Sequence, residues 1–361
     1  MAEIPKKMNA LVLTGPGEFE IQEVDTPSPG PHEALVRVGA VAICGSDPAV
    51  VEGVKFKGLW PPSYPFIPGH EWAGTVVALG ENAGRFQNGD RVAAEAHKGC
   101  GFCRNCMVGR YNLCENYGNM EAGHRHYGFT TPGGYAEYVV ASEKAIHHIG
   151  DMPFDEATNV DTAGTALHAV KRGRVAPGED ICVFGPGAIG LLCFQFGLAM
   201  GAARGFVVGR KHRLALAKEL GAIPIDYEQF DDPVEEIKRL TGGKGVDVAV
   251  DCAGKPQTVQ QCLAAVKKGG RVVLNGFAGN VDLNITDVVM REIDLLGVRA
   301  DPNTPQEVIP LINNGVIPLI NNGTIRIKPM ISHHFPLEKF GEALETFVNR
   351  ADNAIKVIVE P

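Results

Sequence analysis

A glycine-rich segment restricts the folds that this chain can adopt. Residues Gly185–Gly190 read GPGAIG, a GxGxxG pattern between an apolar strand predicted at 181–184 and an apolar helical run. In this pattern the first glycine makes the turn, the second lets the backbone approach a pyrophosphate, and the third permits close packing of a helix whose N-terminus attracts negative charge. The segment therefore predicts a dinucleotide site formed by Gly185, Gly187, Ala188, Ile189 and Gly190.

The residues after Asp180 alternate between apolar strands and helical patterns. Such alternation builds an α/β unit, in which helices cover both faces of a doubly wound parallel sheet. The predicted strands are 181–184, 206–208, 246–250, 271–274 and 295–298, and the clearest helices are 213–220 and 234–240.

The first half of the chain has a different pattern of residue types. Short β-rich runs, broken by glycine, proline and aspartate, predict an all-β unit. The 361 residues leave room for two domains. We place the boundary near residues 152–164, where the β-rich runs give way to alternating strand and helix patterns. The predicted strands are 10–13, 19–24, 34–43, 74–79, 91–94 and 135–140.

Charge and hydropathy exclude several classes of function. The net charge is -8, so a nucleic-acid backbone would be repelled on average. No apolar segment before a cleavage site is found near the N-terminus. The longest apolar stretch, 181–208, contains Pro186, Arg204 and several glycines, which a membrane-spanning helix rarely tolerates together. We expect a cytoplasmic protein that acts on a small molecule, with no nucleic-acid or membrane partner.

Four of the nine cysteines crowd into one loop. Their spacing is C-x2-C-x2-C-x7-C, and four thiolates this close can surround zinc and hold a lobe that has no core of its own. Incidental thiols are one alternative. An iron–sulfur cluster is another, although the run lacks ferredoxin spacing and a following proline. We predict a structural zinc site at Cys100, Cys103, Cys106 and Cys114.

A second set of metal donors is more dispersed. Cys44 follows a predicted strand in the sequence CGSD, and His70 and Glu71 follow a proline-rich segment. A catalytic zinc needs about three mixed ligands and one open position. Each signal alone is weak, because a single histidine beside a glutamate is more often structural.

Five motifs in order give the chain a family resemblance. They are CGSD, GHEWAG, GCGFCRNCMVGRYNLC, GGYAEYVV and VFGPGAIG, and they span nearly the whole sequence. Together they resemble the zinc-dependent medium-chain dehydrogenase/reductases, in the branch of polyol (sorbitol-type) and secondary-alcohol dehydrogenases. The resemblance implies a GroES-like β-rich catalytic domain with the zinc lobe (1–158), a Rossmann cofactor domain (159–299) and a C-terminal segment that returns to the first domain (300–361).

The resemblance also implies a catalytic zinc site. Cys44 and His70 match two zinc ligands, and Glu71 matches an adjacent carboxylate that either binds zinc or sits behind it. Asp161 falls where relatives carry Cys, Glu or Asp, so we expect it as the third ligand, with Glu71 as an exchangeable fourth. The alternative for Asp161 is a cap for the helix that follows. With the lobe, this makes two zinc ions per chain.

The resemblance leaves more than one path open for the proton of the substrate hydroxyl. Ser46 matches the hydroxyl that hydrogen-bonds the substrate oxygen, but Ala49 stands where relatives often carry a relay histidine. The proton must then pass from Ser46 to water, to a cofactor hydroxyl, or to another residue such as His124 or His126.

The end of the strand at 206–208 indicates which nicotinamide is bound. NAD enzymes usually carry Asp or Glu there to bind the ribose 2′-hydroxyl. This chain instead has Gly209, which leaves room, and Arg210, which can bind a 2′-phosphate with help from Arg213 or Lys211. We therefore favour NADP(H) over NAD(H). The alternative is that these cations face solvent and that Asp226 or another acid binds the ribose.

The expected activity is hydride transfer between a secondary alcohol, polyol or ketose and NADP(H). A zinc-free NADPH enone or quinone reductase of the same superfamily is one alternative, and a non-catalytic dinucleotide-binding protein is another. The retained metal donors argue against both. The resemblance also implies a homodimer or homotetramer, with contacts expected around residues 274–296.

One motif has no functional interpretation. The octapeptide VIPLINNG occurs twice in tandem, at 308–315 and 316–323. Two copies are too few for a solenoid, so we interpret them as a duplication that lengthens a connection.

Overall fold

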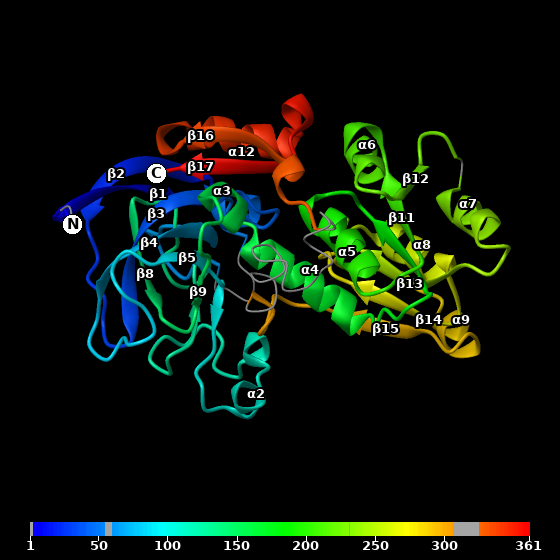
Figure 1. The fold of residues 1–361 in the computed structure, drawn as a ribbon, viewed down its shortest axis with the longest axis horizontal. Coiled ribbons are helices and arrows are strands. Elements are labelled where there is room, and N and C mark those ends of the chain that lie inside the picture. Colours follow the sequence, from blue (N-terminus) through cyan, green and yellow to red (C-terminus); the bar gives the residue numbers. More distant parts are fainter. Residues whose placement is uncertain (1–2, 55–59, 231, 306–324) are drawn as a thin grey trace. The chain divides into compact units, whose positions relative to one another are not determined.

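The computed structural model describes residues 3–54, 60–230, 232–305 and 325–361, so the tandem octapeptide lies outside the described residues. The chain divides into two compact units (Figure 1). The first contains the described residues up to Thr162, Pro305 and those from Met330 onward. The second contains Ala163–Thr304 and residues 325–329.

The first unit is rich in β-structure. Its helical segments are short, apart from α12. The strands are β1 (Lys7–Gly15), β2 (Glu18–Asp25), β3 (Glu33–Ala42), β4 (Glu71–Leu79), β5 (Arg91–Ala94), β6 (His97–Lys98), β7 (Arg125–His126), β8 (Tyr138–Ser142), β9 (Ile146–His148), β16 (Ile331–Pro336) and β17 (Lys356–Glu360). The helices are α1 (Asp47–Val51), α2 (Arg104–Met107), α3 (Phe154–Ala157) and α12 (Phe340–Asn349), with 3-10 turns η2 (Tyr111–Leu113), η4 (Leu337–Lys339) and η5 (Ala351–Asn353). A further 3-10 turn, η3 (Lys328–Met330), begins in the second unit and ends in the first.

Strand β3 is the centre of the first unit. It pairs antiparallel with β4, β8 and β17, in a sheet ordered β16-β17-β3-β4-β5-β9. The register sets Ala42 opposite both Glu71 and Ile358, so the end of β3 and the start of β4 meet the middle of β17 beside Cys44. Figure 1 shows β16 and β17 beside α12, and the rings of Phe340 and Tyr135 pack edge to face in the core.

The second unit is a six-stranded sheet ordered β12-β11-β10-β13-β14-β15, and all of its pairs are parallel. The α/β fold predicted from the alternation is therefore confirmed. Strand β13 is buried at every position, because helices cover both faces of the sheet. The strands are β10 (Asp180–Phe184), β11 (Arg204–Gly209), β12 (Ile223–Asp226), β13 (Val246–Asp251), β14 (Val266–Leu274) and β15 (Asp294–Gly297). The helices are α5 (Ala188–Ala199), α6 (Lys211–Glu219), α7 (Pro233–Leu240), α8 (Pro256–Ala265) and α9 (Ile285–Met290).

Helix α4 (Val160–Arg172) begins in the first unit and continues into the second. Among the described residues, none of the helices combines the length and the apolar character that crossing a bilayer requires.

Candidate functional site

Three metal-donor side chains meet where β3 and β4 pair. The donor atoms of Cys44, His70 and Glu71 all lie within 4.8 Å of one another. Cys44 follows β3 and His70 precedes β4, so the register of this strand pair brings them together. His70 and Glu71 are buried, whereas Cys44 is half-buried. Thiolate, imidazole and carboxylate are the donors that zinc prefers, so this group can hold a zinc ion with one side accessible.

Asp47 orients this donor group. It lies three residues after Cys44 at the start of α1 and is fully buried. Its Oδ2 accepts hydrogen bonds from the Cys44 backbone N–H and the Tyr135 hydroxyl, both 2.8 Å long, and its Oδ1 lies 3.5 Å from the Nδ1 of His70. A carboxylate behind a metal-binding histidine fixes the ring and its tautomer. This aspartate ends the motif CGSD, and its role was not predicted from the sequence.

The pocket around His70 favours positive charge. Burial by itself lowers the pKa of His70, but the Cys44 sulfur and the Asp47 carboxylate outweigh burial and raise that pKa well above its usual value. The negative groups that attract a proton here would also attract a metal cation, which supports the fit of this site to zinc.

Glu71 is held by a buried lysine from the end of the chain. Its Oε1 accepts a 2.6 Å hydrogen bond from the Thr162 hydroxyl, and its Oε2 forms an ion pair with Lys356. Lys356 also donates to the Thr162 hydroxyl at 3.0 Å, and both charged side chains are buried. Burial lowers the pKa of Lys356, but the adjacent Glu71 carboxylate outweighs this and raises it. Both oxygens of Glu71 thus have partners within the protein, and neither Lys356 nor Thr162 carried a signal in the sequence.

Asp161 lies apart from the three-residue donor group. It is the second residue of α4, and its Oδ1 accepts a 3.0 Å hydrogen bond from the Ala96 backbone N–H. It therefore bonds a distant backbone group and does not precede the helix as a cap. Burial raises the pKa of Asp161 to about 6, although His70 acts in the opposite direction.

Aromatic rings extend from His70 along one wall of the site. The Phe129 ring centroid lies 4.5 Å from that of His70 and 4.0 Å from that of His126. The Tyr117 hydroxyl lies 2.6 Å from the Nδ1 of His126 and accepts a 2.7 Å hydrogen bond from the indole N–H of Trp60. The indole nitrogen only donates, so Tyr117 accepts from Trp60, and the tautomer of His126 sets which group donates in the Tyr117–His126 bond. This wall therefore combines apolar faces with polar edges.

Ser46 and His124 occupy different surroundings. Ser46 is half-buried and directly precedes α1, where its side chain makes no capping hydrogen bond. His124 is fully buried, and its Nδ1 accepts a 3.2 Å hydrogen bond from the Gly118 backbone N–H.

The four lobe cysteines form a second donor group. Their sulfurs lie within 4.8 Å of one another, and none of the four is in a disulfide. The sulfurs of Cys100 and Cys106 are 3.9 Å apart and those of Cys103 and Cys114 are 4.0 Å apart. A tetrahedral zinc with bonds of 2.3 Å requires a sulfur separation of roughly 3.8 Å. The geometry therefore fits a closed, structural zinc site.

Hydrogen-bond donors stabilise negative sulfur in the lobe. Burial raises the pKa of Cys100, but the amide of Asn116 and the backbone N–H groups of Phe102 and Cys103 outweigh it and lower the pKa to about 6. The lobe is tied to the segment that follows β5 through the Tyr111 hydroxyl, which donates to Glu95. Glu95 is buried and lies 3.0 Å from the Nε2 of His147.

We expect that removal of one lobe sulfur loosens the lobe and leaves the rest of the protein unchanged. In Cys106→Ser we expect one zinc fewer per chain, measured by elemental analysis, and new tryptic cleavage at Arg104 and Arg110, which lie in the lobe. The lobe has little core of its own, so the metal supplies most of its rigidity. Met107→Ser, an exposed change in α2, is the matched control. Unchanged zinc content and unchanged proteolysis in Cys106→Ser would contradict the assignment.

The glycine-rich loop of the second unit has the geometry of a pyrophosphate cradle. Gly185 has a φ of +105°, which L-residues rarely adopt, and a Cβ at Gly190 would clash with the Gly185 carbonyl oxygen. Gly187 directly precedes α5, at the N-terminus of that helix, where Ala188 and Ile189 follow. The loop backbone is therefore open to a phosphate at the positive end of the helix dipole.

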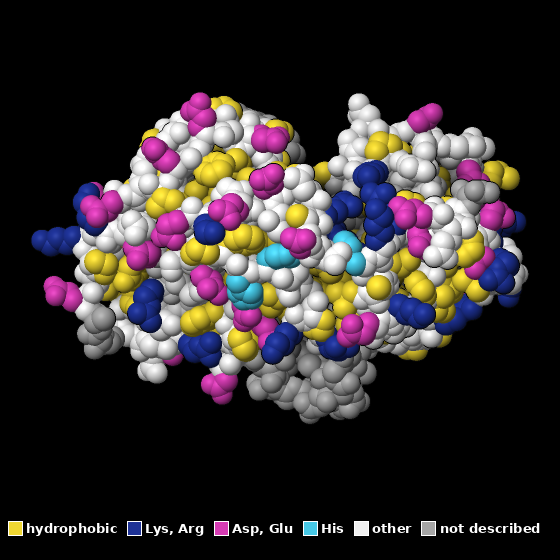
Figure 2. Space-filling model, turned by 90° about the horizontal axis from the view of Figure 1, so that it is seen from above, with side chains coloured by type: hydrophobic (Ala, Val, Ile, Leu, Met, Phe, Trp, Pro, Cys, Tyr) yellow, Lys and Arg dark blue, Asp and Glu magenta, His cyan; other side chains and the backbone are white. Residues whose placement is uncertain are grey.

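Arg210 lies between the end of β11 and the start of α6. It follows β11 directly, and its Nη1 lies 3.3 Å from the Oε1 of Glu228 in a half-exposed ion pair. Gly209 packs against the Pro186 ring, where a side chain would clash. Figure 2 shows Lys and Arg side chains gathered over the α6 part of this unit, the helix that carries Arg213.

Asp226 is engaged within its own turn. Its Oδ1 accepts a 3.0 Å hydrogen bond from the Glu228 backbone N–H, and its Oδ2 accepts a 3.1 Å bond from the Gln229 amide. Asp226 therefore already accepts hydrogen bonds from two groups of its own turn.

Comparison with known proteins places these sites in context. Residues 30–151 match the alcohol dehydrogenase GroES-like domain, and residues 188–314 match the family described as zinc-binding dehydrogenase. The chain is similar to sorbitol dehydrogenase of Bacillus subtilis, with 31% identity over 99% of this chain and 98% of the relative. It is also similar to L-threonine 3-dehydrogenase of Bacillus licheniformis, with 33% identity over 98% of this chain and 99% of the relative.

A solved structure is similar to this chain over its whole length. It is described as a zinc-binding dehydrogenase of Sinorhizobium meliloti bound to NADP. The TM-score is 0.86 at 30% identity, over 99% of this chain and 100% of the other.

Proposed function

We propose that this chain interconverts secondary alcohols or polyols and their ketones with NADP(H). The reason is that the chain belongs to the zinc-dependent alcohol and polyol dehydrogenases of the medium-chain superfamily. The family membership makes it an oxidoreductase on CH–OH donors that uses zinc and a nicotinamide cofactor. The substrate class, the preference for NADP and the presence of two zinc ions are the proposed parts.

The observation that carries the NADP proposal is the end of β11. It runs into Gly209 and Arg210 where a carboxylate would bind an unmodified ribose. Asp226, the alternative, lies at the end of β12 and accepts one hydrogen bond on each oxygen within its own turn. The similar structure from S. meliloti is bound to NADP, which supports the same choice.

The polyol proposal rests on the wall beside His70. The ring of Phe129 and the edges of Tyr117 and His126 give this wall both apolar and polar surface, which suits a substrate that carries hydroxyl groups on a short carbon chain. Full-length similarity to sorbitol dehydrogenase supports this class.

The proposed mechanism assigns a task to each group of residues. Cys44 and His70 would hold zinc, with Asp161 and Glu71 as the further carboxylates, and Cys100, Cys103, Cys106 and Cys114 would hold the structural ion. Bound zinc supplies Lewis acidity to the substrate oxygen, and bound NADP⁺ accepts the hydride. Ser46, half-buried and two residues after Cys44, would accept the hydroxyl proton while its own hydroxyl proton passes on to water or to a cofactor hydroxyl, and Asp47 keeps the His70 ring oriented.

A variant of the β11 terminus is expected to change cofactor choice. In Arg210→Asp we expect the KM for NADP to rise about 10- to 100-fold and the preference to move towards NAD, because a phosphate contact is lost and a repulsive charge is added. The half-exposed Arg210–Glu228 pair contributes little to folding, so the protein should stay intact. Lys218→Asp, near the far end of α6, is the control. An unchanged NADP preference in Arg210→Asp would refute the phosphate assignment.

A substrate panel tests the remaining parts of the proposal. Sorbitol, xylitol, 2,3-butanediol, 2-propanol and L-threonine are assayed with NAD and with NADP, together with an enone and a quinone in the reductive direction. We expect turnover of polyols or secondary alcohols with NADP. Turnover of the enone or quinone alone, unaffected by zinc removal, would favour a reductase instead.

Self-association is also proposed. Phe277, Val289 and Met290 are exposed apolar side chains in the second unit. They lie within residues 274–296 and suit contact with a second copy. Sedimentation analysis of Val289→Lys against the unchanged protein tests this contact.

A further inference from the structure

The ionic partner of Arg210 is an acid on the turn that follows β12. The Nη1 of Arg210 lies 3.3 Å from the Oε1 of Glu228, and the two side chains are 45% and 44% exposed, so a ligand from solvent can reach both. The guanidinium carbon of Arg210 also lies over the Tyr227 ring, 5.7 Å from its centroid. Arg210 therefore meets two side chains of one turn, an aromatic face and a carboxylate.

Backbone hydrogen bonds fix the position of this turn. The Tyr227 backbone N–H donates to the Gly209 carbonyl oxygen at 3.2 Å, which joins the turn to the end of β11. The Glu228 backbone N–H donates to the Oδ1 of Asp226 at 3.0 Å. The fold therefore holds the backbone of Glu228 beside the strand end that carries Arg210.

A second cation of the same segment reaches the glycine-rich loop. Arg213 is the third residue of α6, and its Nη1 lies 3.9 Å from the position that a Cβ would take at Gly187. Gly187 directly precedes α5, where backbone N–H groups point towards a phosphate. The β11–α6 segment thus presents positive charge near the loop, and the carboxylate of Glu228 opposes that charge.

A carboxylate and a phosphate bind a guanidinium in the same way. Both offer oxygens that accept parallel N–H bonds from the planar group. A phosphate at Arg210 would therefore displace the Glu228 carboxylate or share the guanidinium with it, and in the second case the two anions would repel each other. The neutral face of Tyr227 adds no such repulsion. Glu228 therefore opposes a phosphate on the ribose but not an unmodified ribose.

We propose that Glu228 is a specificity-determining residue, which competes with the 2′-phosphate of NADP(H) for Arg210 and so keeps the preference for NADP(H) over NAD(H) small. This inference rests on the assignment of Arg210 to that phosphate under the proposed function. Cofactor choice would then depend on one cation and one acid at the ends of neighbouring strands.

The test measures binding of 2′,5′-ADP and 5′-AMP, which differ only in the 2′-phosphate. Each is titrated calorimetrically into the zinc-loaded protein and into Glu228→Gln. We expect Glu228→Gln to bind 2′,5′-ADP about three- to tenfold more tightly, because an exposed competing ion pair and one repulsion are removed. Binding of 5′-AMP should not change. Unchanged 2′,5′-ADP affinity, or weaker binding of 5′-AMP, would overturn the proposal, the latter because Glu228 would then hold the ribose.

A double variant shows whether Glu228 acts through Arg210. In an Arg210→Gln background, the gain from Glu228→Gln should fall below about twofold, because the shared partner is absent. An equal gain in both backgrounds would be a general effect of charge and would overturn the proposal.

Glu219→Gln is the matched control for the loss of one acid. Glu219 is an exposed acid at the end of α6 and pairs with Arg326 at 2.9 Å. It belongs to the same unit as Glu228 but not to the turn after β12. Its replacement should leave the affinities for both nucleotides unchanged. A gain as large as that of Glu228→Gln would show that position does not matter.

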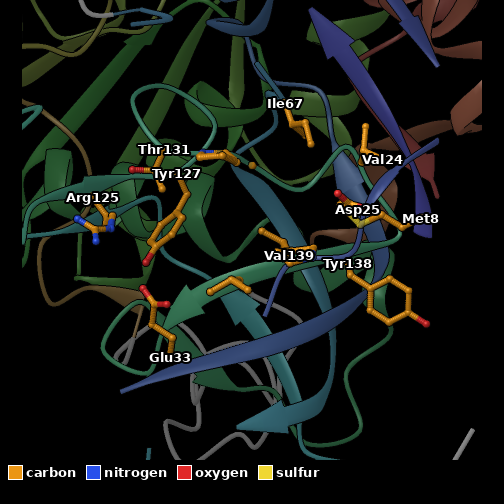
Figure 3. Close-up of a pocket in the computed structure, with 14 residues that line it drawn as sticks. Met8, Val24, Asp25, Glu33, Ile67, Arg125, Tyr127, Thr131, Tyr138 and Val139 are labelled. Atoms are coloured by element: carbon orange, nitrogen blue, oxygen red, sulfur yellow. The ribbon is translucent and has the colours of Figure 1, made fainter. Parts of the chain in front are cut away.

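Arg125→Gln controls for a second place where an anion could bind. Arg125 lines a cavity of about 280 Å³ in the first unit (Figure 3). Two carboxylates, Asp25 and Glu33, line the same cavity against this cation among the described residues, so it should not attract the nucleotides. Loss of 2′,5′-ADP binding in Arg125→Gln would place the probe there and would overturn the proposal.

The single variants separate this inference from the NADP assignment. If Arg210→Gln leaves 2′,5′-ADP affinity unchanged, the NADP assignment fails, and the competition fails with it. If Arg210→Gln weakens that affinity about tenfold but Glu228→Gln has no effect, the NADP assignment stands and the competition alone is wrong.

Discussion

The His70→Ala variant is expected to fold, to retain the metal of the four-cysteine lobe and to lose almost all turnover. His70 supplies the imidazole of the donor group with Cys44 and Glu71. Without it, zinc binding at this site should fail and the Lewis acid should be lost. Because such an ion contributes several kcal/mol to the transition state, kcat/KM should fall at least about 10³-fold.

Metal analysis and kinetics must agree for this result to count. Zinc content should fall by one equivalent per chain, while circular dichroism and NADPH binding to the second unit should stay the same. His148→Ala, an exposed histidine in β9, serves as the control and should leave both zinc content and turnover unchanged. Full turnover of a zinc-depleted His70→Ala protein would show that the chemistry does not use this site.

The second large effect is expected from Lys356→Met. Lys356 is the buried cation that pairs with Glu71, and its loss leaves a carboxylate buried without a positive partner. Breaking one side of a buried pair typically destabilises a protein by about 3–5 kcal/mol. Urea unfolding of the variant and the unchanged protein measures this difference.

Two comparisons make the result specific to the pair. The double variant Lys356→Met/Glu71→Gln removes both charges and should recover most of the lost stability. The same measurement in a Cys44→Ser background prevents a metal ion from neutralising the freed carboxylate. If Lys356→Met were as stable as the unchanged protein in both backgrounds, the ion pair would have no role in stability.

The fold was predictable because its signals are local. The strand–glycine–helix sequence around Gly185 and the alternation after it are readable within short windows, and the structure confirms the parallel sheet. Strand β12 was missed because it is four residues long and contains Pro224. A proline is tolerated there because β12 is the edge strand of its sheet.

The site was predictable only in part. The structure brings Cys44, His70 and Glu71 together, as the family resemblance implied, since β3 and β4 pair in the required register. Asp161 lies outside this group and bonds Ala96, a contact between segments that no local pattern reveals. Lys356 is a single lysine in an apolar strand, and nothing near it in the sequence indicates that it meets a glutamate 285 residues away.

That separation has a consequence for synthesis of the protein on the ribosome. A nascent chain exposes Cys44, His70 and Glu71 early, yet Glu71 lacks its counter-charge until residue 356 has been translated and β17 has docked beside β3. Completion of the sheet at this corner therefore waits for the segment that contains residue 356, and a shorter nascent chain should keep this corner exposed and accessible to chaperones.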